Sequence, residues 1–173
     1  MKIQEQKIQS FLKDLSSKNP TPGGGTVAAL SGVMAASLIE MVCNLTLGKK
    51  GYEDKTSSVI KIQKEVVRIK KRLTVLSEED SKAFKKVVEA YKIGKDNPKR
   101  KESIKKALRY AIEVPFEVRK LTHELEDFAR RTAKLGNKNA VSDAKSAYHL
   151  AHAAGKAALE NININKKALA SLK

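Results

Sequence analysis

Hydrophobic residues recur along most of this chain at intervals of three and four, which is the period of amphipathic helices. The longest series begins at Val59 and ends at Ala90, and its alternating steps are typical of a heptad stripe. Its members are Val59, Ile62, Val66, Ile69, Leu73, Leu76, Asp80, Ala83, Val87 and Ala90. No glycine or proline follows before Gly94, so the series predicts one long helix. A capping-box pattern, Ser77-x-x-Asp80, leaves open a break near Ser77.

One segment is apolar on almost every side. Between Thr26 and Leu47 the only charged residue is Glu40, and the segment opens directly after Gly23-Gly24-Gly25. Such a helix must be surrounded by other helices or by lipid. Its length would allow a membrane span, but Glu40 and Asn44 would be costly at bilayer depth. We therefore expect the central buried helix of a bundle, with no membrane association.

Two more amphipathic patterns flank these helices. The first covers residues 3–15 and stops before a proline. The second could start at Pro98 and runs to a stop at Gly136, with Pro115 predicted to kink or restart it.

An alanine-rich pattern near the C-terminus predicts the last helix. Ser142 or Asn139 could cap it, and the pattern continues to about Leu159. The tail, residues 165–173, is expected to add one short turn. Since there is no interdomain linker, the prediction is a single all-α domain over 1–173. It is a multihelical bundle around a buried central apolar helix, with one long heptad-patterned helix.

The charge of the chain raises the question of nucleic-acid binding. The 173 residues carry a formal net charge of +16. The lysines are spread along the polar sides of the predicted helices, without aromatic interleaving, zinc-ligand spacing or a glycine-rich RNA motif. These features favour a solvated basic surface over a nucleic-acid interface, although such a field would attract a small polyanionic ligand.

The sequence also bears on the cellular compartment. Cys43 is the only cysteine and lies inside the apolar segment, which excludes an intrachain disulfide and fits a reducing compartment. Residues 1–14 lack the apolar stretch of a secretory signal. We therefore expect a cytoplasmic protein in which Cys43 is a small buried hydrophobe.

Asp80 is out of place in the heptad stripe, because the other members are apolar. An ionised carboxylate at a core position is costly unless it is paired, hydrogen-bonded or used in chemistry. Three interpretations stay open: a local cap at a helix break, a structural ion pair with a lysine, or a catalytic carboxylate.

Other polar groups could contribute to a binding site. The glycine turn leaves free N–H groups at a helix N-terminus, which suits an anionic or strongly accepting ligand. It is not a Walker loop, because no Gly-Lys-Ser or Gly-Lys-Thr follows it. Gly48-Lys49-Lys50 follows a helix, where lysines can simply cover the last carbonyls. Asn137 and Asn139 suit a turn or an amide-rich binding loop.

The remaining candidates have simpler explanations. His149 and His152 have a spacing that can bind metal, but no cysteine or carboxylate completes a ligand set, and His123 stands alone. Ser142-Asp143 is explained by a cap with a dipole-favoured carboxylate.

Together these residues resemble the formiminotetrahydrofolate cyclodeaminase family. The block that carries most of the resemblance is Pro22-Gly23-Gly24-Gly25-Thr26-Val27-Ala28-Ala29-Leu30. The matches that follow in family order are Met41-Val42, Asn44-Leu45-Thr46, Gly48-Lys49-Lys50-x-Tyr52, Asp80-x-x-Ala83-Phe84, Ala90-Tyr91, Val114-Pro115, Gly136-Asn137-x-Asn139-Ala140-x-Ser142-Asp143, and Asn161 with Asn165. Two positions depart from the family pattern. Thr26 replaces a serine and keeps its hydroxyl, and Lys145 stands where small residues are usual.

The resemblance implies an all-α, homodimeric enzyme of folate one-carbon metabolism. Its members close 5-formiminotetrahydrofolate to 5,10-methenyltetrahydrofolate with loss of ammonia, and relatives hydrolyse the methenyl compound to 10-formyltetrahydrofolate. It implies that Asp80 is the catalytic acid/base and cation stabiliser, with no metal and no cofactor beyond the tetrahydrofolate substrate. Formimino transfer belongs to a separate domain in larger relatives and is not expected of this chain alone.

The resemblance also implies the residues that bind the substrate. The glycine turn, with Asn44 or Asn139, suits the amide and amino edge of the pterin, and Lys49 and Lys50 suit the anionic glutamate tail, including a polyglutamylated one. The full set is Gly23, Gly24, Gly25, Thr26, Asn44, Lys49, Lys50, Tyr52, Asn139 and Asp143.

Three hypotheses follow for the function. The leading one is a cyclodeaminase, and the alternative is a methenyltetrahydrofolate cyclohydrolase. The third, less favoured, is a non-enzymatic module that binds nucleic acid or another polyanion.

Overall fold

The computed structural model describes residues 3–172, and all regular structure in this range is helical. The long helices are α2 (Gly24–Asn44), α3 (Thr56–Lys92), α4 (Arg100–Leu135) and α5 (Val141–Ala170). The short elements are η1 (Ile3–Glu5), α1 (Ile8–Leu15), η2 (Glu53–Lys55) and η3 (Lys138–Ala140). The predicted all-α class is confirmed. The predicted domain bounds include residues 1, 2 and 173, which lie outside the described range.

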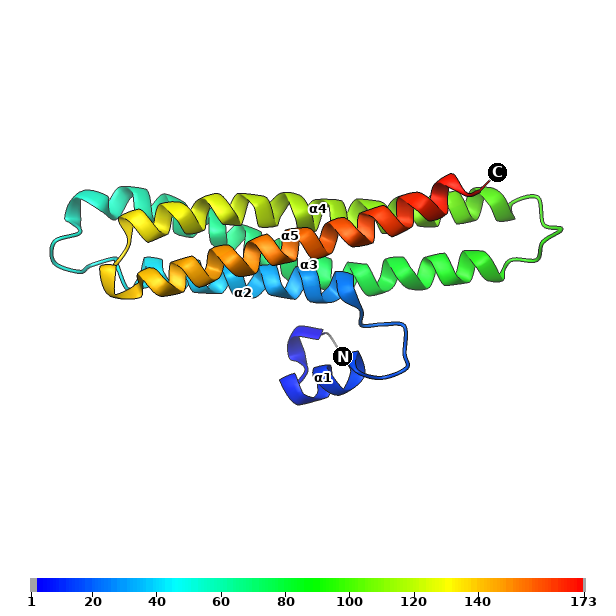
Figure 1. The fold of residues 1–173 in the computed structure, drawn as a ribbon, viewed down its shortest axis with the longest axis horizontal. Coiled ribbons are helices and arrows are strands. Elements are labelled where there is room, and N and C mark those ends of the chain that lie inside the picture. Colours follow the sequence, from blue (N-terminus) through cyan, green and yellow to red (C-terminus); the bar gives the residue numbers. More distant parts are fainter. Residues whose placement is uncertain (1–2, 173) are drawn as a thin grey trace.

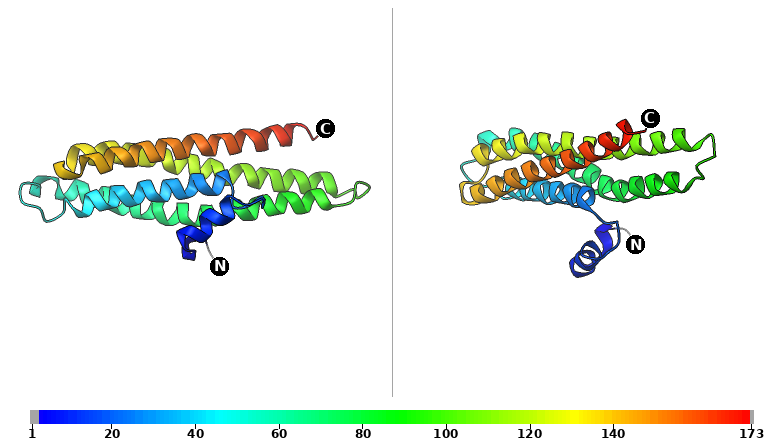
Figure 2. Two further views of the ribbon diagram at one scale, coloured as in Figure 1. Left: turned by 60° about the horizontal axis from the view of Figure 1, so that its bottom comes forward. Right: turned by 45° about the vertical axis from the view of Figure 1, so that its right-hand side comes forward.

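The four long helices form an elongated bundle (Figure 1, Figure 2). α2 packs against α3 and α5 and also contacts α4. It has 21 residues, whereas α3 has 37. Because α2 is the shorter helix, the last part of α3, after Asp80, continues past the N-terminus of α2 (Figure 1). The glycine turn at the start of α2 therefore lies beside the middle of a longer helix.

α2 is the central apolar helix that the sequence predicts. Its buried residues include Ala35, Ala36 and Ile39, which pack among the other three long helices. Glu40, its only charged residue, forms an ion pair with Lys70 of α3. By length and composition alone α2 could cross a membrane. Its packed face is instead covered by three helices, as expected for the core of a bundle.

The heptad stripe forms the buried face of α3. Its apolar members from Val59 to Leu76 are all buried. The helix continues without a break through Ser77, whose hydroxyl donates to the carbonyl of Thr74 at 2.7 Å. The interpretation of Asp80 as a cap at a helix break is therefore wrong.

α4 also differs from its prediction. It begins at Arg100 rather than at Pro98, and Pro115 lies inside it without restarting the helix. A proline removes only one backbone donor, and its neighbours Val114 and Val118 are buried in the core, so packing holds the helix together.

α5 is longer than the sequence suggests, and neither predicted cap is used. It begins after Ala140, so Ser142 lies in its first turn, and Asn139 lies in η3. The helix continues to Ala170 because Ile162 is buried and the Nδ2 of Asn165 donates to the carbonyl of Ala111 on α4 at 2.8 Å. The prediction of a separate turn in the tail is therefore wrong.

The N-terminal segment lies outside the bundle (Figure 2). The predicted first helix is divided into η1 and α1, and no residue of α1 is buried. The backbone N–H of Ile3 donates to the carboxylate of Glu78 on α3, which ties this segment to the bundle.

Candidate active site

Asp80 of α3 lies against the first turn of α2. Its Oδ2 accepts a hydrogen bond from Thr26 Oγ1 at 2.9 Å, and the backbone N–H of Thr26 also donates to the carboxylate. The same carboxylate occupies the space beside Gly25. A Cβ added to Gly25 would lie 2.0 Å from Oδ1 and 2.6 Å from Cγ of Asp80. This contact therefore requires glycine at position 25.

The environment of Asp80 makes it a weaker acid than a surface aspartate. Burial raises the pKa of the carboxyl, and the hydrogen bonds from Thr26 oppose that rise only in part. Among the ion pairs found within residues 3–172, none includes Asp80. The ion-pair interpretation is thus without support in this range. Asp80 is a half-buried carboxyl that is held in position by hydrogen bonds.

Two polar side chains that the predicted set omits lie beside this contact. Ser81 Oγ is 3.3 Å from Thr26 Oγ1. On α5, the amide of Asn161 lies next to Gly24, because a Cβ added there would be 3.7 Å from Asn161 Nδ2. Asn161 was part of the family resemblance, but no chemical signal in the sequence marked it as close to the glycine turn.

A hollow of about 400 Å³ lies along α3 beginning one turn after Asp80. Phe84, one turn after Asp80 on α3, lines it together with Pro20 and Thr21 from the segment before the glycine turn. The hollow offers room for part of a ligand, and the ring of Phe84 is available for stacking.

Three other predicted binding residues, Lys49, Tyr52 and Asn139, gather at the far end of α2. Lys49 Nζ donates to Asn137 Oδ1 at 2.9 Å, and the same oxygen accepts from the backbone N–H of Asn139 at 3.1 Å. The hydroxyl of Tyr52 accepts from the backbone N–H of Lys138 at 3.0 Å. The loop after α2 and the turn before α5 are therefore joined in one polar cluster, which we call the lysine cluster: Lys49, Tyr52, Asn137 and Asn139.

Asn137 is the centre of this cluster, although it is absent from the predicted binding set. Its backbone N–H donates to Thr46 Oγ1 at 2.8 Å, and its Nδ2 donates to the carbonyl of Leu45 at 3.1 Å. It is buried, and it fixes the position of Lys49. The Gly136-Asn137 pair was the available signal, since it suits a turn with an amide side chain.

The two clusters are far apart within one chain. The Asp80 contact is at the first turn of α2 and the lysine cluster follows its last turn. A helix of 21 residues spans about 30 Å. One folate cannot extend from the glycine turn to Lys49 of the same chain, so the prediction that both ends of α2 hold one ligand fails for a single subunit.

Three predicted residues lie outside both clusters. Asn44 accepts a hydrogen bond from Gln63 of α3, and Lys50 is exposed. Asp143 is half-buried in the first turn of α5. Lys145 does not crowd the core, because Ala144 and Ala147 fill the buried face of α5.

Comparisons with known proteins show the family of the chain. The family model described as formiminotransferase-cyclodeaminase matches residues 7–172. The chain is 37% identical to a methenyltetrahydrofolate cyclohydrolase of Methylorubrum extorquens over 95% of its own length and 81% of that protein. It is 26% identical to the mouse formimidoyltransferase-cyclodeaminase over 94% of its length, but it spans only 31% of that larger protein.

A solved structure shows the same fold. The crystal structure of formiminotetrahydrofolate cyclodeaminase from Thermotoga maritima superposes with a TM-score of 0.90 at 33% identity, covering 98% of this chain and 82% of that one. The family model and these relatives span nearly the whole described bundle. The chain therefore belongs to the formiminotransferase-cyclodeaminase family.

Proposed function

We propose that this chain is a cyclodeaminase, which converts 5-formiminotetrahydrofolate to 5,10-methenyltetrahydrofolate and ammonia. Membership of the family assigns it to cyclodeaminase or cyclohydrolase chemistry in folate metabolism, and both reactions pass through carbon bound to N5 and N10 of the folate. The observation that carries the proposal is the half-buried Asp80 carboxyl, which hydrogen bonds from Thr26 hold against Gly25.

The proposed reaction needs one proton to be moved. N10 attacks the formimino carbon, and a bond from N10 to that carbon forms. Asp80 takes the proton from N10 and delivers it to the amino group on the same carbon. The carbon–nitrogen bond then breaks, ammonia leaves, and the substrate's positive charge stays on the methenyl product. Asp80 ends in its initial protonation state.

The surroundings of Asp80 support this role. A carboxyl whose pKa is raised by burial holds a proton more readily than a surface aspartate and can return it to a leaving amine. In its ionised form the same group lies next to a delocalised cation, which it would stabilise in a water-poor site. The proposed reaction requires no metal or redox cofactor. We also propose a cytoplasmic location, which the single free Cys43 suggests.

A cyclohydrolase is the second candidate, because the relative that is 37% identical carries that name. In that reaction Asp80 would take a proton from water as it attacks the methenyl carbon, and would return it to N5 as the carbon–N5 bond breaks. The second proton of the water is released to solvent as the formyl C=O forms, so the cation becomes the neutral 10-formyl product. Both reactions use one carboxyl beside the same carbon, so the Asp80 site is compatible with either.

We further propose that the enzyme is a homodimer in which α2 packs against α2 of a second copy. The outward face of α2 is apolar, with Met34 52%, Met41 37% and Leu45 48% exposed. Leu30 and Leu38 lie half-buried on the same face. An apolar stripe of this length along one helix is typical of a contact with another helix.

An antiparallel crossing of the two copies of α2 would also complete the site. Met34 is the midpoint of Gly24–Asn44, so a two-fold axis near it brings the first turn of one α2 next to the last turn of the other. The lysine cluster of the partner subunit, which follows the last turn of its α2, would then lie near Asp80. This arrangement removes the separation of about 30 Å that one chain imposes.

In the proposed dimer each tetrahydrofolate contacts two subunits. The glycine turn and Asn161 accept the pterin edge, and Phe84 stacks on an aromatic ring of the substrate. Lys49 and Lys50 of the partner subunit attract the carboxylates of the glutamate tail, including those of a polyglutamylated substrate.

The proposal is tested by offering both folates to the purified protein. With 5-formiminotetrahydrofolate we expect methenyl absorbance to rise together with released ammonia, and Asp80→Ala to abolish both. If the wild-type protein does not increase the rate of methenyl formation, the cyclodeaminase proposal is contradicted. Decay of supplied methenyltetrahydrofolate without ammonia, lost in the same variant, identifies the cyclohydrolase instead.

A further inference from the structure

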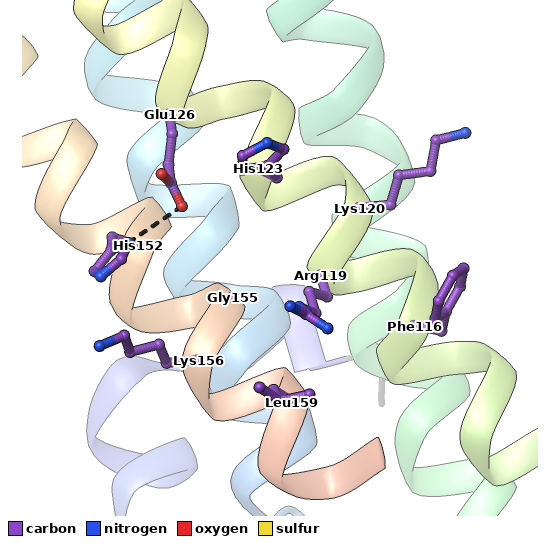
Figure 3. Close-up of a pocket in the computed structure, with 9 residues that line it drawn as sticks. All are labelled: Phe116, Arg119, Lys120, His123, Glu126, His152, Gly155, Lys156 and Leu159. Atoms are coloured by element: carbon purple, nitrogen blue, oxygen red, sulfur yellow. Dashed lines mark hydrogen bonds and ion pairs between the residues drawn. The ribbon is translucent and has the colours of Figure 1, made fainter. Parts of the chain in front are cut away.

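A groove between α4 and α5 holds a concentration of positive charge that the proposed reaction does not use. Its volume is about 550 Å³ (Figure 3). The residues that line it are Phe116, Arg119, Lys120, His123, Glu126, His152, Gly155, Lys156 and Leu159. Three of these side chains are permanent cations and two are imidazoles, against one carboxylate.

The single carboxylate of the groove is already engaged. Glu126 is only 8% exposed, and its Oε1 lies 3.4 Å from His152 Nδ1 while its Oε2 lies 3.7 Å from Arg130. Figure 3 shows Glu126 and His152 facing each other at one end, with Arg119 farther along the groove. Glu126 thus leaves Arg119, Lys120 and Lys156 without an acidic partner among the residues that line the groove.

The acids of α4 that could balance these cations point elsewhere. Glu117 pairs with Arg72 of α3 at 2.6 Å, and Glu124 lies 3.7 Å from Arg68 of α3. Glu117 and Glu124 are therefore engaged on the α3 side of α4, where Glu117 also interacts with Lys120, and Glu126 is the one carboxylate that lines the groove. Arg119, Lys120 and Lys156 are exposed, and cations gathered along one cleft raise the local concentration of anions.

A second groove on the other side of α4 provides a comparison. It lies between α3 and α4, and its volume is about 860 Å³. Its charged residues are three cations, Lys86, Lys106 and Arg109, and three carboxylates, Glu89, Glu102 and Glu113. The α3–α4 groove is balanced although the chain carries a net charge of +16, so overall charge alone does not explain the α4–α5 groove.

The α4–α5 groove is also separate from the Asp80 site. Leu159 lines the groove, whereas Asn161, two residues later, lies beside Gly24. Residues two apart on a helix point to opposite sides of it. The groove and the candidate active site are therefore on opposite faces of α5.

We propose that the α4–α5 groove is a second binding site, which takes a small organic anion with two or more negative charges. Arg119 extends into the groove and is the principal ligand, and Lys156 and Lys120, whose ammonium groups point outward in Figure 3, turn inward when the anion binds. Phe116 and Leu159 supply an apolar surface at one end. The anionic groups are phosphates or carboxylates, since Arg and Lys recognise both.

The test measures binding of pyrophosphate and of citrate by calorimetry at constant ionic strength. The pair Arg119→Ala and Lys156→Ala should weaken binding of the preferred probe by about tenfold or more. The matched pair Arg109→Ala and Lys106→Ala removes the same charge from the balanced groove and should change binding by less than about twofold. A preference for pyrophosphate indicates a phosphate ligand, and a preference for citrate indicates a carboxylate ligand.

Three results would overturn the proposal. Equal weakening in both pairs would mean that the probes respond only to net charge, and no binding of either probe at millimolar concentration would mean that the groove is not a site. Displacement of the probe by methenyltetrahydrofolate would mean that the groove belongs to the folate site. Because the readout is binding, failure of the cyclodeaminase assay leaves this test unaffected.

Discussion

The carboxylate of Asp80 occupies the position that a side chain on Gly25 would need, with Oδ1 only 2.0 Å from an added Cβ. The contact explains why the apolar helix must start with glycine rather than with another small residue. It also links the two features that were most unusual in the sequence: a glycine turn, and a carboxylate in a heptad stripe.

Gly25→Ala should therefore remove activity while the fold persists. The methyl group displaces the carboxylate from Thr26, so turnover should fall by about 100-fold or more, as for loss of a positioned acid/base. The measurement is methenyl formation, with circular dichroism as a check on helix content. Gly94→Ala is the matched control, since an added Cβ there meets nothing within 4 Å. Equal activity in both variants would contradict the role of this contact.

The stability of Asp80→Asn relative to the wild type should increase as the pH rises. Burial raises the pKa of Asp80 in the folded state, so its stabilising contribution is present below the ordinary aspartate pKa and is lost as the pH rises through the folded value. Asparagine avoids that loss and can still accept from Thr26. Urea unfolding of both proteins measures the difference in free energy, in a pH series that starts below 3.8, the ordinary aspartate pKa, and rises to neutrality. We expect it to grow with pH in favour of the variant, and the opposite trend would show that the ionised form is the stabilised one.

The heptad stripe of α3 gives the clearest stability prediction. Leu73 is 0% exposed, and a Cβ added to Gly32 of α2 would lie only 2.9 Å from its Cδ1. Leu73→Ala should cost about 2–5 kcal/mol of unfolding free energy. Val75→Ala, on the same helix at 47% exposure, should cost less than about 0.5 kcal/mol. Similar losses in the two variants would mean that the stripe is not the core of the bundle.

Hydrophobic periodicity was enough to predict the bundle, because burial of an apolar face determines where a helix packs. It identified α3 and α2, and it exposed Asp80 as an anomaly. It failed at the end of α5, where Asn161 and Asn165 look like a polar tail. Both lie within the helix because Asn165 donates to the carbonyl of Ala111 on α4, a tertiary contact that no local pattern contains.

The site was predicted only in part, for a similar reason. Motifs identify residue types, but distance along a helix decides which motifs can meet. Lys49 and Gly25 belong to one continuous sequence block, yet the length of α2 separates them by about 30 Å. The role of Asn137 in holding Lys49 depends on a turn that lies 88 residues away in sequence.

The proposed α2 contact predicts a dimer that one charge can dissociate. Met34→Glu would place an unpaired carboxylate at the two-fold axis, next to its own copy. Burial of two like charges should weaken association by about 100-fold or more. Sedimentation or light scattering over a range of concentrations measures the change. Ile164→Glu is the control, because Ile164 is a 63% exposed apolar residue on α5, away from the α2 stripe. If both variants remain dimers, the interface lies elsewhere.

If each active site is shared between two subunits, two inactive variants should complement each other in a mixed dimer. Asp80→Ala and Lys49→Glu should each inactivate the homodimer, because each site needs Asp80 from one subunit and the lysine cluster from its partner. In a mixed dimer one site carries both changes and the other carries neither. Random exchange of subunits should therefore restore about a quarter of the wild-type activity. The measurement is methenyl formation after the two inactive proteins are mixed, unfolded and refolded together. A mixture that stays inactive, although mixed dimers are detected by mass, would place Asp80 and Lys49 in sites that do not meet.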